Sequence, residues 1–123
     1  MTVVRVLLVD DQPDFLRAMA AVIGETSDLA VVGTASTGEE CLTLVAKLLP
    51  DLVLMDVNLP GIDGMEAARR LRERDAAPVV ILLSTYDNDA GEHFVADCGA
   101  AAYITKSDLG PDRLEQAWSR SGR

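Results

Sequence analysis

Short apolar runs alternate along this chain with segments in which apolar residues recur every three or four positions. The short runs predict buried strands, and the periodic segments predict amphipathic helices. The runs expected to form strands are residues 6–9, 29–35, 52–55, 79–83 and 102–105. Such alternation predicts right-handed crossovers and helices on both faces of one sheet. The expected fold is therefore α/β, a (βα)5 doubly wound five-stranded parallel sheet.

Turn and cap residues indicate where the helices begin and end. Pro13 and Asp63 mark two helix starts, and Pro50 stops the second helix. The fourth helix, expected over residues 88–98, has few apolar positions and is the weakest of the five. Gly99 is expected to follow it as the residue that ends the helix.

Composition limits the classes of protein to consider. The chain has 123 residues, enough for one domain with a core, and 49% of them are hydrophobic. With two Phe, two Tyr and one Trp, that core must be mostly aliphatic. A net charge of −9 argues against nucleic-acid binding by this domain itself, since phosphate backbones require clustered Lys and Arg.

The two cysteines, the N-terminus and the absence of long apolar runs indicate in which compartment of the cell the protein is expected. Cys41 and Cys98 are far apart and each lies in an apolar helical pattern, so we expect buried, reduced thiols and no zinc site. The N-terminus lacks the layout of a signal peptide, and no run approaches membrane-spanning length. The sequence predicts a soluble, cytoplasmic protein with no membrane partner.

The predicted strands end in residues that can handle a phosphoryl group. Asp10 and Asp11 follow the first strand, Asp56 the third, Ser84 the fourth and Lys106 the fifth. Ligands of parallel sheets collect at the carboxyl ends of the strands. We therefore expect three acids, a hydroxyl and an amine to meet at one edge of the sheet.

Three carboxylates at one edge would repel one another at pH 7, so a hard cation that prefers oxygen ligands is their natural partner. Mg²⁺ suits, because it takes octahedral oxygen ligands and keeps several waters. Taken singly, each residue has a simpler explanation: Asp11 caps a helix, Asp56 ends a strand and Lys106 forms a salt bridge. For the set as a whole we favour a site that holds a metal ion and a phosphoryl group.

The chain resembles the receiver domain of bacterial two-component response regulators over essentially its whole length. The resemblance rests on Asp10-Asp11, residues 54–64, Ser84 and residues 99–106. Residues 32–35 and 38–40 are further similar to receivers of the NarL/FixJ class. That class usually carries a DNA-binding helix-turn-helix domain after the receiver.

The resemblance implies specific roles for the residues at the strand ends. Asp56 would be the phosphoacceptor, and Lys106 would contact the phosphoryl group. Ser84 would be the switch hydroxyl and Tyr103 the switch aromatic, turning inward when Ser84 moves toward the phosphoryl group.

The resemblance also implies a strand order and a metal site. The order would be flavodoxin-like, 2-1-3-4-5. Asp11 would bind Mg²⁺ directly and Asp10 largely through water, together with Asp56 and the backbone carbonyl of Asn58.

One position departs from the family pattern. Most receivers have a proline in a cis peptide after the lysine, whereas Ser107 follows Lys106 here. A cis bond before a residue other than proline costs roughly 2.5–4 kcal/mol, so the sequence leaves the state of this bond open. Tyr86, near the expected phosphoryl site, is predicted to shield it from water, and His93 to be exposed and unrelated to the chemistry.

These residues predict a phosphorylation-activated signalling switch that is not an enzyme, although it assists its own phosphorylation and dephosphorylation. Residues 1–118 would form the receiver, and residues 119–123 would begin a linker to a DNA-binding output domain that is absent here. The implied partner is a sensor histidine kinase, and the sequence leaves open whether a homodimer forms on phosphorylation.

Other classes compete with this interpretation. A small Mg²⁺-dependent phosphohydrolase with an Asp nucleophile would usually need a second Asp where Asn58 stands. A flavin carrier would need a phosphate-binding loop where Asp10 and Asp11 stand. A receiver that works without phosphorylation is a further alternative, although no residue needed for phosphorylation is missing.

Overall fold

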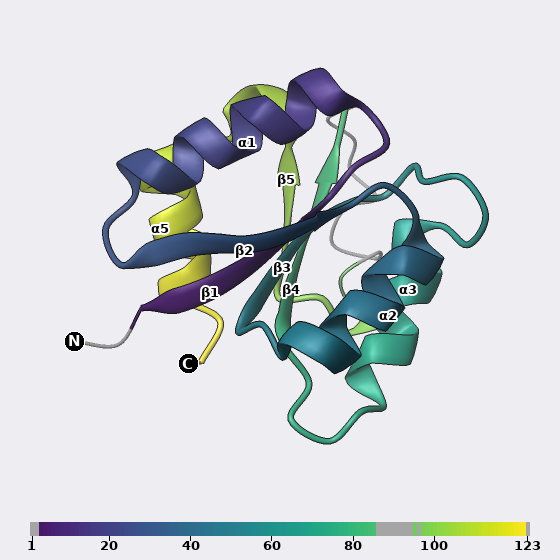
Figure 1. Cartoon of the computed structure of the whole chain (residues 1–123). Helices are drawn as coiled ribbons and strands as arrows, with labels where there is room; N and C mark the ends of the chain where they lie inside the picture. The colour runs from purple at the N-terminus through teal and green to yellow at the C-terminus, as the bar shows by residue number, and fades with distance from the viewer. Residues whose placement is uncertain (1–2, 86–94, 96, 123) are drawn as a thin grey trace.

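Five parallel strands form one sheet in the order β2-β1-β3-β4-β5, with helices on both faces (Figure 1). The computed structural model describes residues 3–85, 95 and 97–122. The predicted fold class and strand order are confirmed. The elements are β1 (Val4–Val9), α1 (Pro13–Glu25), β2 (Leu29–Ala35), α2 (Gly38–Leu48), β3 (Leu52–Asp56), α3 (Gly64–Arg72), β4 (Val79–Ser84), β5 (Ala102–Thr105), the 3-10 helix η1 (Lys106–Asp108) and α5 (Pro111–Ser119).

The sheet separates two apolar layers. Helices α1 and α5 cover one face, where Met19 and Leu114 are fully buried, and α2 and α3 cover the other, where Cys41 and Leu71 are fully buried (Figure 1). Strand β3 lies at the centre, and all five of its residues are buried. A strand that is buried on both faces has no polar alternation, which explains its uninterrupted apolar sequence.

Side-chain caps fix where α2 and α3 begin. The Thr37 hydroxyl oxygen accepts a hydrogen bond from the N–H of Glu40 at 3.0 Å, and Glu40 Oε1 accepts one from the N–H of Ser36 at 2.7 Å. This reciprocal pair resembles a capping box. At α3, Asp63 Oδ1 accepts a hydrogen bond from the N–H of Glu66 at 2.8 Å, as its position before the helix predicts.

Helix α1 begins at Pro13, as expected, and α5 ends close to the expected end of the receiver. The N-cap of α1 is Gln12, without a side-chain cap hydrogen bond, so Asp11 is not the cap of this helix. Helix α5 extends through Ser119, one residue past the expected end of the receiver at 118. Within the described ranges, no helix combines the length and apolar character needed to cross a membrane.

The weak fourth helix falls largely outside the described residues, together with Tyr86 and His93. Its described last residues, Asp97 and Cys98, are helical, and Cys98 is buried as predicted. Gly99 follows with φ of 79° and donates its N–H to the Val95 carbonyl at 3.0 Å. Glycine ends the helix here because a left-handed backbone strains residues with a side chain.

Candidate phosphoryl-transfer site

The carboxyl ends of β1, β3, β4 and β5 bring the predicted site residues to one edge of the sheet. Asp10 follows β1, Asp56 closes β3, Ser84 closes β4, and Lys106 follows β5. Strand β1 pairs with β2 on one side and β3 on the other, so the chain reverses its direction of progress across the sheet at this point. Doubly wound folds bind ligands at such a switch point.

Three carboxylates meet there. Ligand oxygens of Asp10, Asp11 and Asp56 all lie within 4.8 Å of one another. Asp10 is fully buried and Asp56 is 4% exposed, whereas Asp11 is exposed. The set therefore combines two desolvated acids with one that faces solvent.

Backbone amides hold the two buried carboxylates in place. Asp10 Oδ1 accepts a hydrogen bond from the N–H of Gln12 at 2.8 Å, and Asp56 Oδ1 accepts one from the N–H of Asn58 at 3.1 Å. In each case the donor lies two residues later, in the turn that leaves the strand. Each acid is therefore oriented by its own loop, with its second oxygen directed to another group.

That other group is the ammonium of Lys106. Its Nζ atom lies 2.7 Å from Asp10 Oδ2 and 3.3 Å from Asp56 Oδ2, and its side chain is 11% exposed. The Nζ atom also lies 4.3 Å from the centroid of the Phe15 ring, on the first turn of α1. Nothing in the sequence around Phe15 indicates this contact, since only folding brings α1 over the end of β5.

Burial raises the pKa of the Asp56 carboxyl above its usual value of 3.8. The Asn58 hydrogen bond and the charge of Lys106 act in the opposite direction, and the charge of Asp10 adds to the increase. The increase prevails because desolvation penalises the charged form of a buried acid. A cation beside Asp56 would favour its ionised form.

The donor set fits a divalent cation. With all side chains ionised, three carboxylates and one ammonium leave an excess of two negative charges. All ligand atoms on offer are carboxylate oxygens, which hard cations such as Mg²⁺ prefer. The structure therefore contains an acidic cluster that can hold a metal.

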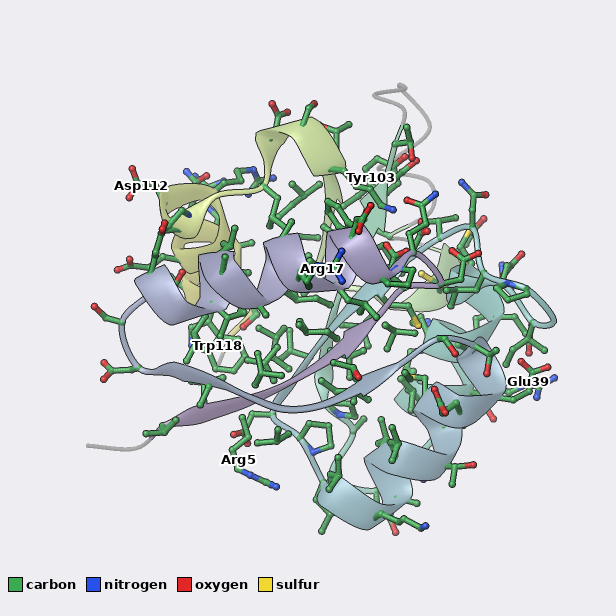
Figure 2. All side chains as sticks on the ribbon, turned by 45° about the horizontal axis from the view of Figure 1, so that its top comes forward. Arg5, Arg17, Glu39, Tyr103, Asp112 and Trp118 are labelled. Atoms are coloured by element: carbon green, nitrogen blue, oxygen red, sulfur yellow. The ribbon has the colours of Figure 1, made fainter. Side chains whose placement is uncertain are left out.

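The loop between β3 and α3 is tied to two neighbouring segments. The N–H of Gly64 donates to the carbonyl of Val57 at 2.9 Å. The N–H of Ile62 donates to Glu39 Oε2 at 3.4 Å, and Glu39, labelled in Figure 2, lies on the first turn of α2. These contacts fix the path of the loop that contains Asn58, whose backbone carbonyl stays a predicted metal ligand.

Ser84 and Tyr103 lie on the same face of the sheet. Ser84 pairs in register with Thr105, and Tyr103 lies two residues before Thr105 on β5. Ser84 is 5% exposed, and Tyr103 is partly buried against the apolar layer beneath α2 and α3. In Figure 2, Tyr103 lies at the upper end of the sheet, above α1 in this view.

The segment after Lys106 follows a different path from the one that a cis proline would give. Among the described residues no peptide bond is cis, so the Lys106–Ser107 bond is trans. Residues Lys106–Asp108 form η1, and the Thr105 hydroxyl donates a hydrogen bond to Asp108 Oδ2 at 2.8 Å. This turn fixes the backbone from which the Lys106 side chain extends.

Comparison with known proteins identifies the class to which this fold and site belong. The family model described as the response regulator receiver domain matches residues 6–119. The chain therefore belongs to the family of response regulator receiver domains.

Curated relatives include whole regulators. The chain is 40% identical to the positive alginate biosynthesis regulatory protein of Pseudomonas aeruginosa, over 96% of this chain and 47% of that protein. It is 37% identical to the response regulator GacA of the same organism, over 93% of this chain and 53% of that protein. The chain thus spans about half the length of these relatives.

Solved structures of receiver domains superimpose on essentially the whole length of this chain. The signal receiver domain of a response regulator NarL from Mycobacterium tuberculosis superimposes with a TM-score of 0.88 at 30% identity, covering 100% of both chains. The response regulator domain of Thermotoga maritima CheB gives a TM-score of 0.85 at 28% identity, covering 98% of both.

Proposed function

We propose that this chain is a signalling switch in which Asp56 accepts a phosphoryl group. The observation that carries the proposal is the position of Asp56, a buried carboxylate with the Lys106 ammonium at 3.3 Å and two further acids close by. An oxygen of Asp56 forms a bond to phosphorus while the bond between phosphorus and the donor breaks, which gives an acyl phosphate. Positioning and charge neutralisation do most of the work in such transfers.

The acidic cluster would hold Mg²⁺ through Asp11 directly, Asp10 largely through water, Asp56 and the backbone carbonyl of Asn58. When bound, the ion supplies positive charge that neutralises phosphoryl oxygens. Lys106 adds a positive charge on the side of Asp10 and Asp56, which reduces the repulsion between the attacking carboxylate and the phosphoryl group. The Asn58 N–H keeps Asp56 oriented during the attack.

Ser84 and Tyr103 would transmit the change. The phosphoryl oxygens on Asp56 offer the Ser84 hydroxyl a new acceptor. Movement of Ser84 toward them opens space on the face that it shares with Tyr103, and the aromatic side chain turns inward to fill it. A local charge event thereby biases an element with two arrangements.

The phosphoryl donor, the compartment and the output domain are proposed from the family and the relatives of this chain. The donor would be a sensor histidine kinase in the cytoplasm. Residues 119–123 would lead from the receiver, residues 1–118, into an output domain that binds DNA. Support for a role in transcriptional regulation comes from a relative 35% identical over 85% of this chain, the transcriptional regulatory protein LiaR of Bacillus subtilis.

A phosphohydrolase acting on separate substrates is less well supported. Such an enzyme usually has a general acid two residues after the nucleophile, and the amide of Asn58 cannot donate a proton in that role. We therefore propose that the chain acts only on its own phosphorylation state.

The direct test is the intact mass of the protein after incubation with acetyl phosphate and Mg²⁺. We expect a gain of one phosphoryl group in the wild type, and no gain in Asp56→Asn or when EDTA removes the metal. The matched control is Asp63→Asn, because this acid lies in the same loop and Asn also caps helices. Wild type that gains no mass, or Asp56→Asn that still does, would overturn the proposal.

A further inference from the structure

The ammonium of Lys106 is enclosed by groups from three elements. Asp10 follows β1 and Asp56 ends β3, and their Oδ2 atoms lie 2.7 Å and 3.3 Å from Nζ. The third neighbour is the face of the Phe15 ring on α1, whose centroid is 4.3 Å away. A cation at this distance over an aromatic face is attracted by the negative charge of the π system.

The ring differs from the two acids in one respect that matters for the chemistry. Asp10 and Asp56 also belong to the acidic cluster, so a metal ion competes with Lys106 for their oxygens. The contact with Phe15 uses no carboxylate oxygen, so a metal ion at the acidic cluster would not compete for it. Lys has a long flexible stem, so its ammonium needs a fixed neighbour to stay in one place.

Phe15 lies on the first turn of α1. Pro13 begins α1, and the N–H of Phe15 donates to the carbonyl of Gln12 at 3.1 Å. The side chain is half-buried against the apolar layer beneath α1 and α5. Gln12 also orients Asp10 through its own N–H, so the same turn of the chain carries the ring and orients the buried acid.

We propose that the Phe15 ring is the positioning group that keeps the Lys106 ammonium beside Asp56 during phosphoryl transfer. This role rests on the proposed function, since it concerns the same site. Phe15 touches no reacting atom in this account, and it acts only through the position of Lys106. In this role the aromatic side chain acts through the electron-rich face of its π system as well as through its volume.

The first test compares initial phosphorylation rates of wild type, Phe15→Tyr and Phe15→Leu with acetyl phosphate at saturating Mg²⁺. A small donor is used because, unlike a kinase, it brings no protein surface that could dock on α1. We expect Tyr to keep nearly the wild-type rate and Leu to lower it by roughly fivefold, the effect of losing one cation–π contact. Leu16→Ala, an apolar truncation on the same turn, is the control, and we expect it to reduce stability without lowering the rate of the folded protein.

The second test observes the contact without any phosphorylation. An aromatic ring shifts the proton resonances of a methylene group held over its face. We expect the ε-methylene protons of Lys106 to be shifted upfield relative to those of Lys47, the other lysine, in wild type and Phe15→Tyr, with and without Mg²⁺. The shift should disappear in Phe15→Leu.

The outcomes distinguish a failure of the proposed function from a failure of the role proposed for Phe15. If wild type accepts no phosphoryl group, the proposed function fails and this role fails with it. If wild type is phosphorylated but Phe15→Leu keeps the same rate, or Lys106 shows no ring shift, only the role of Phe15 is overturned. If Phe15→Tyr is as slow as Phe15→Leu, the ring contributes packing alone, which also overturns it.

Discussion

The backbone carbonyl of Asp56 occupies the space that a side chain on Gly64 would need. A Cβ built on Gly64 would contact this carbonyl oxygen and would lie 2.9 Å from the Cα of Val57, closer than side chains tolerate. Gly64 is the first residue of α3, so the helix begins directly against the residue proposed to carry the phosphoryl group. A shift at the start of α3 is therefore expected to move Asp56.

Gly64→Ala should destabilise the protein and slow its phosphorylation. The added methyl group cannot be accommodated without moving the backbone of Asp56 or Val57, and overpacking of this kind costs roughly 1–3 kcal/mol. Urea unfolding measures the loss. The matched control is Gly24→Ala, where no atom lies within 4 Å of the new methyl group and the helical site should gain up to about 1 kcal/mol. Equal effects at the two glycines would contradict this account.

Lys106→Met should destabilise the metal-free protein, because it leaves the buried carboxylates of Asp10 and Asp56 without their cation. The expected loss in the free energy of unfolding is about 2 kcal/mol in EDTA. Mg²⁺ should restore more stability to this variant than to wild type, since Lys106 no longer competes for Asp10. Paired urea titrations with EDTA and with Mg²⁺ check both effects. A loss of the same size in the two solutions would show that the ammonium and the metal do not share these acids.

Asp56→Asn should stabilise the metal-free protein at neutral pH but not in acid. The pKa of Asp56 is raised in the folded state, so the fold keeps this proton to a higher pH than the unfolded chain does. The stability that the group contributes is complete below its unfolded pKa of 3.8 and is lost as pH rises through the raised folded pKa. The difference in unfolding free energy between variant and wild type, measured in EDTA, should therefore grow from low pH to pH 7. A difference that shrinks over this range would mean that the pKa of Asp56 is lowered by folding.

Cys41 should be unreactive while the protein is folded. Burial in the apolar layer beneath α2 and α3 raises the pKa of its thiol from 9.0 to about 12. The unfolded thiol ionises first, so stability is complete below pH 9 and falls above it, by about 1 kcal/mol at pH 10. Cys41→Ala should lack this part of the loss between pH 8 and pH 10. Rapid reaction of Cys41 with a thiol reagent at pH 8, before unfolding, would contradict the prediction.

Much of the fold could be predicted because the strands are local signals. The apolar run of β3 and the acid that ends it are adjacent in sequence, and parallel pairing brings Asp56 level with the ends of its neighbours. Asp63 before α3 is likewise a local cap signal that the structure confirms.

The parts that could not be predicted depend on how elements pack. The contact between Phe15 and Lys106 joins residues on α1 and after β5, and nothing in either local sequence indicates it. The turn that follows the trans bond after Lys106 includes the Thr105–Asp108 hydrogen bond, which forms only once the chain has turned. The bond from Ile62 to Glu39 requires α2 and the β3–α3 loop to be adjacent, which only the folded chain shows.

The central claim, that Asp56 is the phosphoacceptor, is tested most directly by converting the acyl phosphate into a stable mark. Borohydride reduces an aspartyl phosphate to homoserine with loss of phosphate, and tandem mass spectrometry then locates the altered residue. After treatment with acetyl phosphate and Mg²⁺, the account predicts homoserine at position 56. Homoserine at Asp10 or Asp11 instead, or at no position in protein that has gained a phosphoryl group, would contradict it.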